Sequence, residues 1–346
     1  MTEFLTYKLI LVAAVFGITL FIAMYSTYFE RKVAAFMQDR IGPNRAGPFG
    51  ILQPLADGIK FFMKEEIIPA NANKILFVIG PCVAMLTALM AGVVIPWGGS
   101  LEINGVQYSL QIADLNIGIL YVFAVVSIGV YGIMIGGWAS NNKFSLLGAI
   151  RASAQMISYE LAMGLSIIAL IMVTGTLSLG EIAAMQGGGV GSEWNFWNIV
   201  YQPLGFMIFI ICAFAECNRM PFDLPESETE LVGGYHTEYS SMKLGFYMFA
   251  KYINMFISSA LMATLYFGGY NFPFMNDLGL STNVVTILGT LALFVKIAMF
   301  IFFFMWIRWT LPRFRYDQLM NLGWKGLLPL AIANVLITAF VMILLD

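Results

Sequence analysis

Apolar segments long enough to cross a lipid bilayer are the feature that most constrains the fold of this chain. They cover approximately residues 5–29, 75–97, 117–139, 156–178, 199–216, 245–268, 284–308 and 326–345. A helix needs about 20 apolar residues to cross the hydrocarbon core, where the backbone must satisfy its own hydrogen bonds. Only 11% of the residues are charged, against about 25% in soluble domains. The sequence therefore predicts an all-α, polytopic membrane protein in which eight transmembrane helices form a single domain over residues 1–346.

Basic residues predict how these helices are oriented. Of the 18 lysines and arginines, all but Lys8 and Lys296 lie in or beside the connections 30–74, 140–155, 217–244 and 309–325. Because Lys and Arg accumulate in cytoplasmic loops, these four connections are predicted to face the cytoplasm and both termini the outer side.

The few cysteines and the single histidine limit the cofactors that the chain itself can hold. Cys82, Cys212, Cys217 and His236 are too few and too scattered for an iron–sulfur cluster or a zinc site, so we expect no metal on this chain. Any electron carrier would belong to a partner protein. The net charge of −2 gives no indication of nucleic-acid binding.

The first of the four connections contains a short amphipathic segment after Pro54. Its apolar positions are Leu55, Ile59 and Phe62, and its charged positions are Asp57, Lys60 and Lys64. Both sets have the spacing of a helix face, but the segment is too short and too charged to span a membrane. We predict a helix that lies in the membrane interface. On its own, the preceding triplet Glu30-Arg31-Lys32 is interpreted as charges that reach the lipid headgroups.

The connection after the fifth apolar segment concentrates acidic residues at a membrane boundary. Between Ala215 and Tyr239 it contains Glu216, Asp223, Glu226, Glu228, Glu230 and Glu238. Pro221 and Pro225 prevent a regular helix through its middle, so we expect a shaped loop. Neighbouring carboxylates that lose hydration repel one another, which raises their pKa values and makes protonation easier. By composition alone, a solvated acidic loop is the simpler interpretation.

Two charged residues fall inside apolar segments, Glu160 in the fourth and Lys296 in the seventh. A charge in the membrane interior is costly unless it is neutralised or paired, and such residues often mark ion or proton pathways. Glu160 is therefore predicted to be a buried acid, and Lys296 to have an internal partner or to be neutral. The two would also suit the midplane site of a secondary transporter, although no internal repeat supports that interpretation.

Four stretches of the predicted cytoplasmic connections match, in order, the motifs of one protein family. They are ERK with QDRIGPNRAGPFGILQP and ADGIKFFMKE; GWAS with LLGAIRASAQMISYE; AECNRMPFDLPESETELVGGYHTEY; and RWTLPRFRYDQLMNLGWK. Over essentially its whole length the chain resembles the H-type membrane subunit of the proton-pumping NADH:quinone oxidoreductase, respiratory complex I. The resemblance implies a component of a bacterial inner membrane, with periplasmic termini, that takes part in quinone reduction coupled to proton translocation.

The resemblance also implies partners. The flavin and the iron–sulfur clusters would lie on peripheral-arm subunits, and the one with the terminal cluster would help to close a quinone chamber. Small membrane-arm subunits would connect this chain to antiporter-like subunits, and membrane lipids would surround it.

Site residues follow from the resemblance position by position. Those placed along the quinone chamber or its mouth are Arg31, Gln38, Arg40, Asp57, Lys60, Glu65 and Arg219. Those placed on an acidic proton path toward the pumping subunits are Glu160, Glu216, Asp223, Glu226, Glu228, Glu230 and Glu238. We further predict that Glu226, Glu228 and Glu230 share protons, because their spacing by two places them in one short segment.

One departure from the family occurs in the sixth apolar segment. Many members carry a glutamate before the tyrosine of a motif like E-Y-x-N, where this chain has Lys251. A buried lysine needs a counter-charge, so we predict that Lys251 pairs with Glu238 or Glu160.

The alternative within the superfamily is the equivalent subunit of a membrane-bound hydrogenase or formate hydrogenlyase, which uses no quinone. The fuller charged connection after the first apolar segment favours the quinone-reducing complex by analogy.

Overall fold

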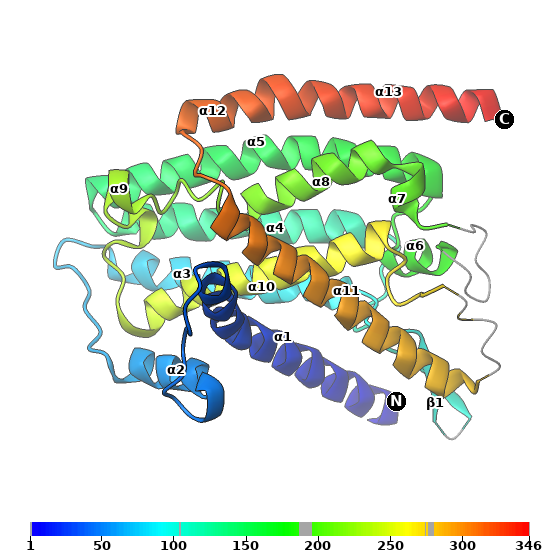
Figure 1. Cartoon of the computed structure of the whole chain (residues 1–346), viewed down its shortest axis with the longest axis horizontal. Coiled ribbons are helices and arrows are strands. Elements are labelled where there is room, and N and C mark those ends of the chain that lie inside the picture. The colour runs from blue at the N-terminus through cyan, green and yellow to red at the C-terminus, as the bar shows by residue number, and fades with distance from the viewer. Residues whose placement is uncertain (1, 104, 187–195, 274, 276–279, 346) are drawn as a thin grey trace.

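The helices of the computed structural model lie mostly side by side, and α1 and α11 cross the others obliquely (Figure 1). The structure describes all residues except 1, 104, 187–195, 274, 276–279 and 346. The helices are α1 Thr2–Met37, α2 Gln53–Met63, α3 Lys74–Ala91, α4 Gly118–Ala139, α5 Lys143–Thr174, α6 Leu179–Met185, α7 Asn198–Tyr201, α8 Pro203–Glu216, α9 Glu228–Leu231, α10 Ser241–Tyr266, α11 Thr282–Thr310, α12 Tyr316–Asn321 and α13 Leu328–Leu345. Strands β1 (Ser100–Ile103) and β2 (Val106–Ser109) pair antiparallel, with Ser100 opposite Ser109.

Seven helices of the described chain are long and apolar enough to cross a membrane. They are Leu5–Met37, Lys74–Val94, Gly118–Ala139, Lys143–Thr174, Ser241–Tyr266, Thr282–Thr310 and Tyr316–Leu345. The last joins α12 to α13 through a π-helical turn at Leu322–Leu327. The prediction of an all-α, polytopic membrane protein is confirmed.

The segment predicted as the fifth span, residues 199–216, is divided in the structure. α7 ends at Tyr201 and α8 begins at Pro203, which has no N–H to continue the preceding helix. α8 has 14 residues. A helix of that length rises about 21 Å, less than the roughly 30 Å of a hydrocarbon core. A total of eight spans therefore stays a prediction.

Two helices extend beyond their predicted limits. α5 begins at Lys143, because the Asn142 side chain accepts a hydrogen bond from the backbone N–H of Phe144 at 2.9 Å and caps the helix. Most of the connection predicted at 140–155 is therefore helical. α1 continues to Met37, because residues 30–41 contain neither glycine nor proline to end it.

Small residues bring α3 and α4 together. A Cβ on Gly132 would lie 2.7 Å from the backbone nitrogen of Ala84, and one on Gly136 would overlap the hydroxyl of Tyr247 from α10. The Tyr247 hydroxyl donates to the Gly132 carbonyl at 3.0 Å. These glycines thus place α10 directly against the α3–α4 pair.

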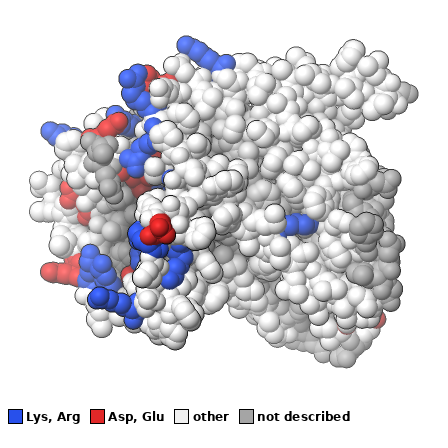
Figure 2. Space-filling view, viewed as in Figure 1, with Lys and Arg blue, Asp and Glu red and all other residues white. Residues whose placement is uncertain are grey.

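Charged side chains gather at one end of the molecule (Figure 2). This charged end comprises α2, α9, α12, the adjoining ends of α1 and α11, and the loop 217–240 (Figure 1). The hairpin, α6 and α7 lie at the opposite end. The amphipathic helix predicted after Pro54 is α2, and its apolar residues Leu55, Ile59 and Phe62 are exposed, as an interfacial helix requires.

Candidate functional site

A pocket of about 330 Å³ opens between α1, α2 and α10 at the charged end. Three of the residues predicted along the chamber, Arg31, Asp57 and Lys60, line it. Arg31 Nη1 lies 2.7 Å from Asp57 Oδ2. Lys64 and Tyr252 add further polar groups to the lining, and the rest is mostly apolar. We call this space the polar pocket.

A second pocket of about 320 Å³ adjoins the polar pocket along α1 and α10. Its lining is wholly apolar and consists of Leu20, Phe21, Met24, Met85, Met242, Phe246 and Phe249. Met24 and Phe249 belong to both linings. The two spaces together present charged groups at one side and flexible apolar side chains at the other, which suits an amphipathic ligand.

The remaining residues predicted for the chamber lie elsewhere. Gln38 and Arg40 are exposed and bond to each other, with 2.8 Å between Arg40 Nε and Gln38 Oε1. Glu65 is exposed and lies outside the lining of the polar pocket. Arg219 is buried behind the pocket rather than on its surface. The predicted set is therefore divided between the pocket, the surface and the interior.

Glu30 forms the centre of a buried ion-pair group behind the polar pocket. Arg219 Nη1 lies 2.8 Å from Glu30 Oε2, and Arg308 of α11 contacts the other carboxylate oxygen. The Arg219 guanidinium also lies over the ring of Tyr252, 4.2 Å from its centroid. Since Tyr252 lines the polar pocket, a single side chain separates that pocket from the Glu30–Arg219 pair.

Asp223, Glu226 and Lys251 form a second ionic group next to the first. Lys251 contacts Glu226 directly, and its Nζ lies 3.9 Å from Asp223 Oδ1. Arg313 Nη2 approaches Asp223 Oδ2 at 3.5 Å. Glu226 also lies 3.4 Å from His236 Nε2 and accepts a hydrogen bond from the Tyr235 hydroxyl at 2.9 Å. Lys251 thus has the carboxylate partner that was predicted, but that partner is Glu226 and not Glu238 or Glu160.

The two acids of this group have opposite tendencies to bind a proton. Burial raises the pKa of Glu226, but the charge of Lys251 and the contact with His236 outweigh it and hold that pKa well below the usual range. Burial dominates at Asp223 and raises its pKa, because Lys251 is farther away and the Glu226 charge repels a second anion. The group therefore holds an ionised Glu226 beside an Asp223 that is easier to protonate.

Glu160 and Glu216 lie deeper in the helix bundle. Glu160 accepts a hydrogen bond from the Ser127 hydroxyl of α4. Glu216 is 5% exposed, and neither of its carboxylate oxygens has a hydrogen-bond partner among the described residues. The two are close enough for their charges to interact. Glu160 is only partly buried, so its assignment as a buried acid of a proton path stays a prediction.

The other predicted path acids are not collected in one segment. Glu230 is exposed and pairs with Arg151 of α5, 2.6 Å between Arg151 Nη1 and Glu230 Oε2. Glu238 accepts a hydrogen bond from Asn142 Nδ2 at 2.5 Å. The side chain of Glu228 lies outside the described residues. Glu226 and Glu230 have separate basic partners, so sharing of protons between them stays a prediction without geometric support.

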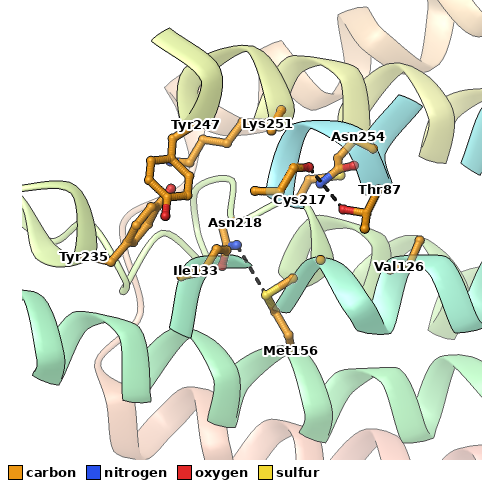
Figure 3. A pocket seen from close by; sticks show the side chains of 14 residues that line it. Thr87, Val126, Ile133, Met156, Cys217, Asn218, Tyr235, Tyr247, Lys251 and Asn254 are labelled. Atoms are coloured by element: carbon orange, nitrogen blue, oxygen red, sulfur yellow. Dashed lines mark hydrogen bonds between the residues drawn. The ribbon is translucent and has the colours of Figure 1, made fainter. Parts of the chain in front are cut away.

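A small cavity of about 30 Å³ lies beside Lys251 (Figure 3). Its lining includes Lys251, Tyr235, Tyr247, Asn218, Cys217, Asn254 and Thr87. A second cavity of about 30 Å³ is lined by Glu216 and Ser258 within an apolar wall. Val126 belongs to both linings, and Cys217 Sγ of the first lies 3.4 Å from Ser258 Oγ of the second. A thin layer of side chains therefore separates the two cavities.

Several residues of the site were missed by sequence reasoning. Glu30 was interpreted as a headgroup contact, yet it is 4% exposed and paired with two arginines. Tyr252, Arg308 and Arg313 were not assigned to the site either. The length of the first helix could have indicated from the sequence that Glu30 is not at the helix end. The nearest helix breaker after Glu30 is Gly42, about three turns farther along the chain.

Comparisons with known proteins agree with the motifs. A sequence model of the NADH dehydrogenase family matches residues 9–339. The chain is 72% identical over 336 residues to the NADH-quinone oxidoreductase H subunit 1 of Cytophaga hutchinsonii, covering 97% of this chain and 96% of the relative. It is 62% identical to the H-type polypeptide of the same enzyme in Flavobacterium psychrophilum, covering 99% of each. Identity to the corresponding polypeptide of Thermomicrobium roseum is 50%, over 92% of this chain and 90% of the relative. The chain therefore belongs to the family of H-type membrane subunits of NADH-quinone oxidoreductases.

Proposed function

We propose that this protein binds the quinone headgroup in the polar pocket of a proton-translocating NADH:quinone oxidoreductase and passes the resulting charge change to its buried acids. The observation that carries the proposal is the polar pocket itself. Arg31, Asp57, Lys60 and Tyr252 line the polar pocket, and the apolar pocket adjoins it along α1 and α10. A quinone requires both environments, polar donors for the carbonyl oxygens and an apolar path for the isoprenoid tail.

The polar groups behind the pocket supply a route for the charge change. Tyr252 contacts Arg219, Arg219 pairs with Glu30, and Arg308 joins Glu30 from α11. Quinone reduction consumes two electrons and two protons, so it alters the charge beside this group. Because coupled carboxylates titrate together, such a change alters proton occupancy at Asp223 and farther along at Glu216 and Glu160.

The assembly follows from the same proposal. Flavin and iron–sulfur clusters belong to peripheral-arm subunits, one of which closes the polar pocket and brings its terminal cluster close to the quinone. Small membrane-arm subunits connect the chain to the antiporter-like subunits. The charged end faces the cytoplasm of a bacterial cell and both termini face the periplasm, in accordance with the distribution of lysine and arginine.

A photoreactive quinone analogue tests this proposal in the intact complex. After irradiation we expect labelled peptides from residues 24–64 and 244–252, which contain the lining of the polar pocket. Excess natural quinone should suppress the labelling. Peptides from α13, which contribute nothing to this lining, serve as the control. Labelling confined to α13 or to other subunits would contradict the proposal.

Kinetics give an independent check. Asp57→Asn removes the carboxylate that holds Arg31, so we expect a higher KM for quinone with the complex still assembled. Arg315→Met, at an exposed pair with Asp317, is the matched control and should leave KM unchanged. A purified complex that evolves hydrogen and reduces no quinone would indicate the hydrogenase-type alternative instead.

A further inference from the structure

The geometry points to Lys251 as a proton-exchanging residue that connects the ionic group of the loop 217–240 to the small cavity beside Glu216. This inference rests on the proposed function and deepens it, because it assigns a step of the proton path to a cation. It concerns a position where the family often carries an acid and this chain does not.

Among the described residues, Lys251 is the one charged side chain of the ionic group that also lines the first cavity, and Tyr235, which donates to Glu226, lines that cavity beside it. It contacts Glu226 on one side and lies 3.9 Å from Asp223. Its side chain runs from α10 toward the part of the cavity where Tyr235 and Tyr247 lie (Figure 3). At 13% exposure the side chain is withdrawn from bulk solvent, so it exchanges protons with its neighbours rather than with the cytoplasm.

Titratable groups surround Lys251. From the loop these are Glu226 with His236 behind it, Asp223 with Arg313 behind it, Tyr235 and Cys217, and from its own helix Tyr247. Groups that can donate or accept a proton therefore lie beside the Lys251 amine.

Water in the first cavity is the acceptor of the Lys251 proton in this inference. The cavity volume of about 30 Å³ is enough for one or two water molecules, and Asn218, Asn254 and Thr87 provide polar partners. The Lys251 ammonium gives a proton to water there and becomes a neutral amine. Protonated Asp223 then returns a proton to the amine. One proton has moved from the loop to the cavity, and the lysine is an ammonium again.

The second cavity extends this route to Glu216. The contact between Cys217 and Ser258 and the shared residue Val126 separate the two linings. Glu216, with both carboxylate oxygens unpartnered among the described residues, is the acceptor on the far side. A lysine thus replaces the acid of the family pattern without interrupting the route.

The substitution Lys251→Arg tests the role of proton exchange separately from the role of the positive charge. Arginine keeps the positive charge and can pair with Glu226, but it does not release its proton in proteins. We expect the assembled complex, reconstituted in vesicles, to reduce quinone while losing most of the protons pumped per electron. Lys243→Arg is the matched control, because Lys243 is on the same helix, is 12% exposed and pairs with Glu66. It should pump at the wild-type ratio.

A wild-type pumping ratio in Lys251→Arg would overturn the inference and leave the lysine as a fixed counter-charge. Glu216→Gln is measured in parallel, because a wild-type ratio there contradicts the proposed acid path itself. If the arginine variant does not assemble, Lys251→His and Lys251→Met are compared. Histidine exchanges protons and methionine does not. Pumping by the histidine variant alone supports the inference, and equal ratios in the two variants overturn it.

Discussion

The charged end and the opposite end of this molecule bury polar groups in different ways. At the charged end the buried polar groups include ion pairs, with Glu30 between Arg219 and Arg308 and Glu226 against Lys251. At the opposite end they are mainly side-chain amides and backbone carbonyls. Gln186, Asn198 and Asn271 are each at most 2% exposed and tie α6, α7 and the end of α10 together.

The lysine beside that amide network is held differently from the cations of the charged end. Lys296 Nζ donates to the carbonyl oxygens of Phe267, Gly269 and Asn271 at 2.7, 2.8 and 2.5 Å. Its ammonium also lies 4.9 Å from the centroid of the Trp197 ring. Lys296 therefore has the internal partners that were predicted, but they are dipoles that cannot change their protonation.

The difference indicates that the two ends of the molecule have different roles. Amides and carbonyls satisfy buried polar groups at any pH, so they fix structure. Carboxylates paired with cations satisfy one another only while both are ionised, so their contacts respond to each proton that arrives. The charged end is thus the part of the chain whose buried contacts depend on protonation, as the proposed function requires.

The largest expected effect comes from breaking the Glu30 group. Arg219→Met leaves a buried carboxylate with Arg308 as its only basic contact among the described residues, at a cost of about 3–5 kcal/mol. We expect loss of the protein from the assembled complex, measured by native electrophoresis of solubilised membranes. Glu30→Gln added to Arg219→Met should restore part of the assembly. The exposed Arg315→Met variant should assemble normally, and an equal loss there would remove the contrast between buried and surface pairs.

The next effect tests the opposite end. Lys296→Met deprives three backbone carbonyls of their donor, and we expect a loss of about 2–3 kcal/mol in stability. The measurement is the thermal unfolding midpoint of the purified complex. Complexes that do assemble should keep the wild-type ratio of protons pumped per electron. A changed ratio would mean that Lys296 takes part in proton transfer and would break the comparison between the two ends.

Much of this organisation could be predicted from the sequence, and the failures have identifiable causes. Hydrophobic segments predict the helices and the membrane class, because these depend on local spacing. The assignment of Arg31, Asp57 and Lys60 to one chamber came from the family resemblance, and the structure places all three along the polar pocket. Pairings across distant segments depend on how helices pack. Lys251 could be predicted to need a carboxylate, but its choice of Glu226 follows from the path of a loop shaped around Gly234. A Cβ at Gly234 would overlap the Pro225 carbonyl oxygen.

The two loop acids should respond to pH in opposite directions. The depressed pKa of Glu226 means that its stabilising contribution is present above the unfolded value of about 4.3 and is lost as pH falls below it. The raised pKa of Asp223 means that its contribution is present below about 3.9 and is lost as pH rises through the higher folded value. At pH 7, Glu226→Gln should therefore destabilise the protein by about 1–2 kcal/mol. Asp223→Asn should be neutral or stabilising.

Unfolding midpoints of both variants between pH 3 and 8 check this pair of signs. The Glu226→Gln curve should lie below the wild type near neutral pH and approach it as the pH falls below about 4.3, whereas the Asp223→Asn curve should rise relative to the wild type as the pH increases through the raised pKa of Asp223. Parallel curves would mean that Asp223 and Glu226 carry equal charge in the folded protein, and the assignment of the readily protonated site to Asp223 would be wrong.

The smallest effect is expected at an ion pair that belongs to the charged end but not to its interior. Arg151 and Glu230 are close in space, yet their side chains are 29% and 44% exposed, so water competes with the pair. Arg151→Gln and Glu230→Gln should each change stability by about 0–1 kcal/mol and leave pumping unchanged. Their double-mutant cycle, followed by thermal unfolding and by the proton-to-electron ratio, should be additive. A loss of pumping in Glu230→Gln would place this exposed acid on the proton path together with the buried ones. Burial would then no longer distinguish the acids that transfer protons from the solvent-exposed acids that do not.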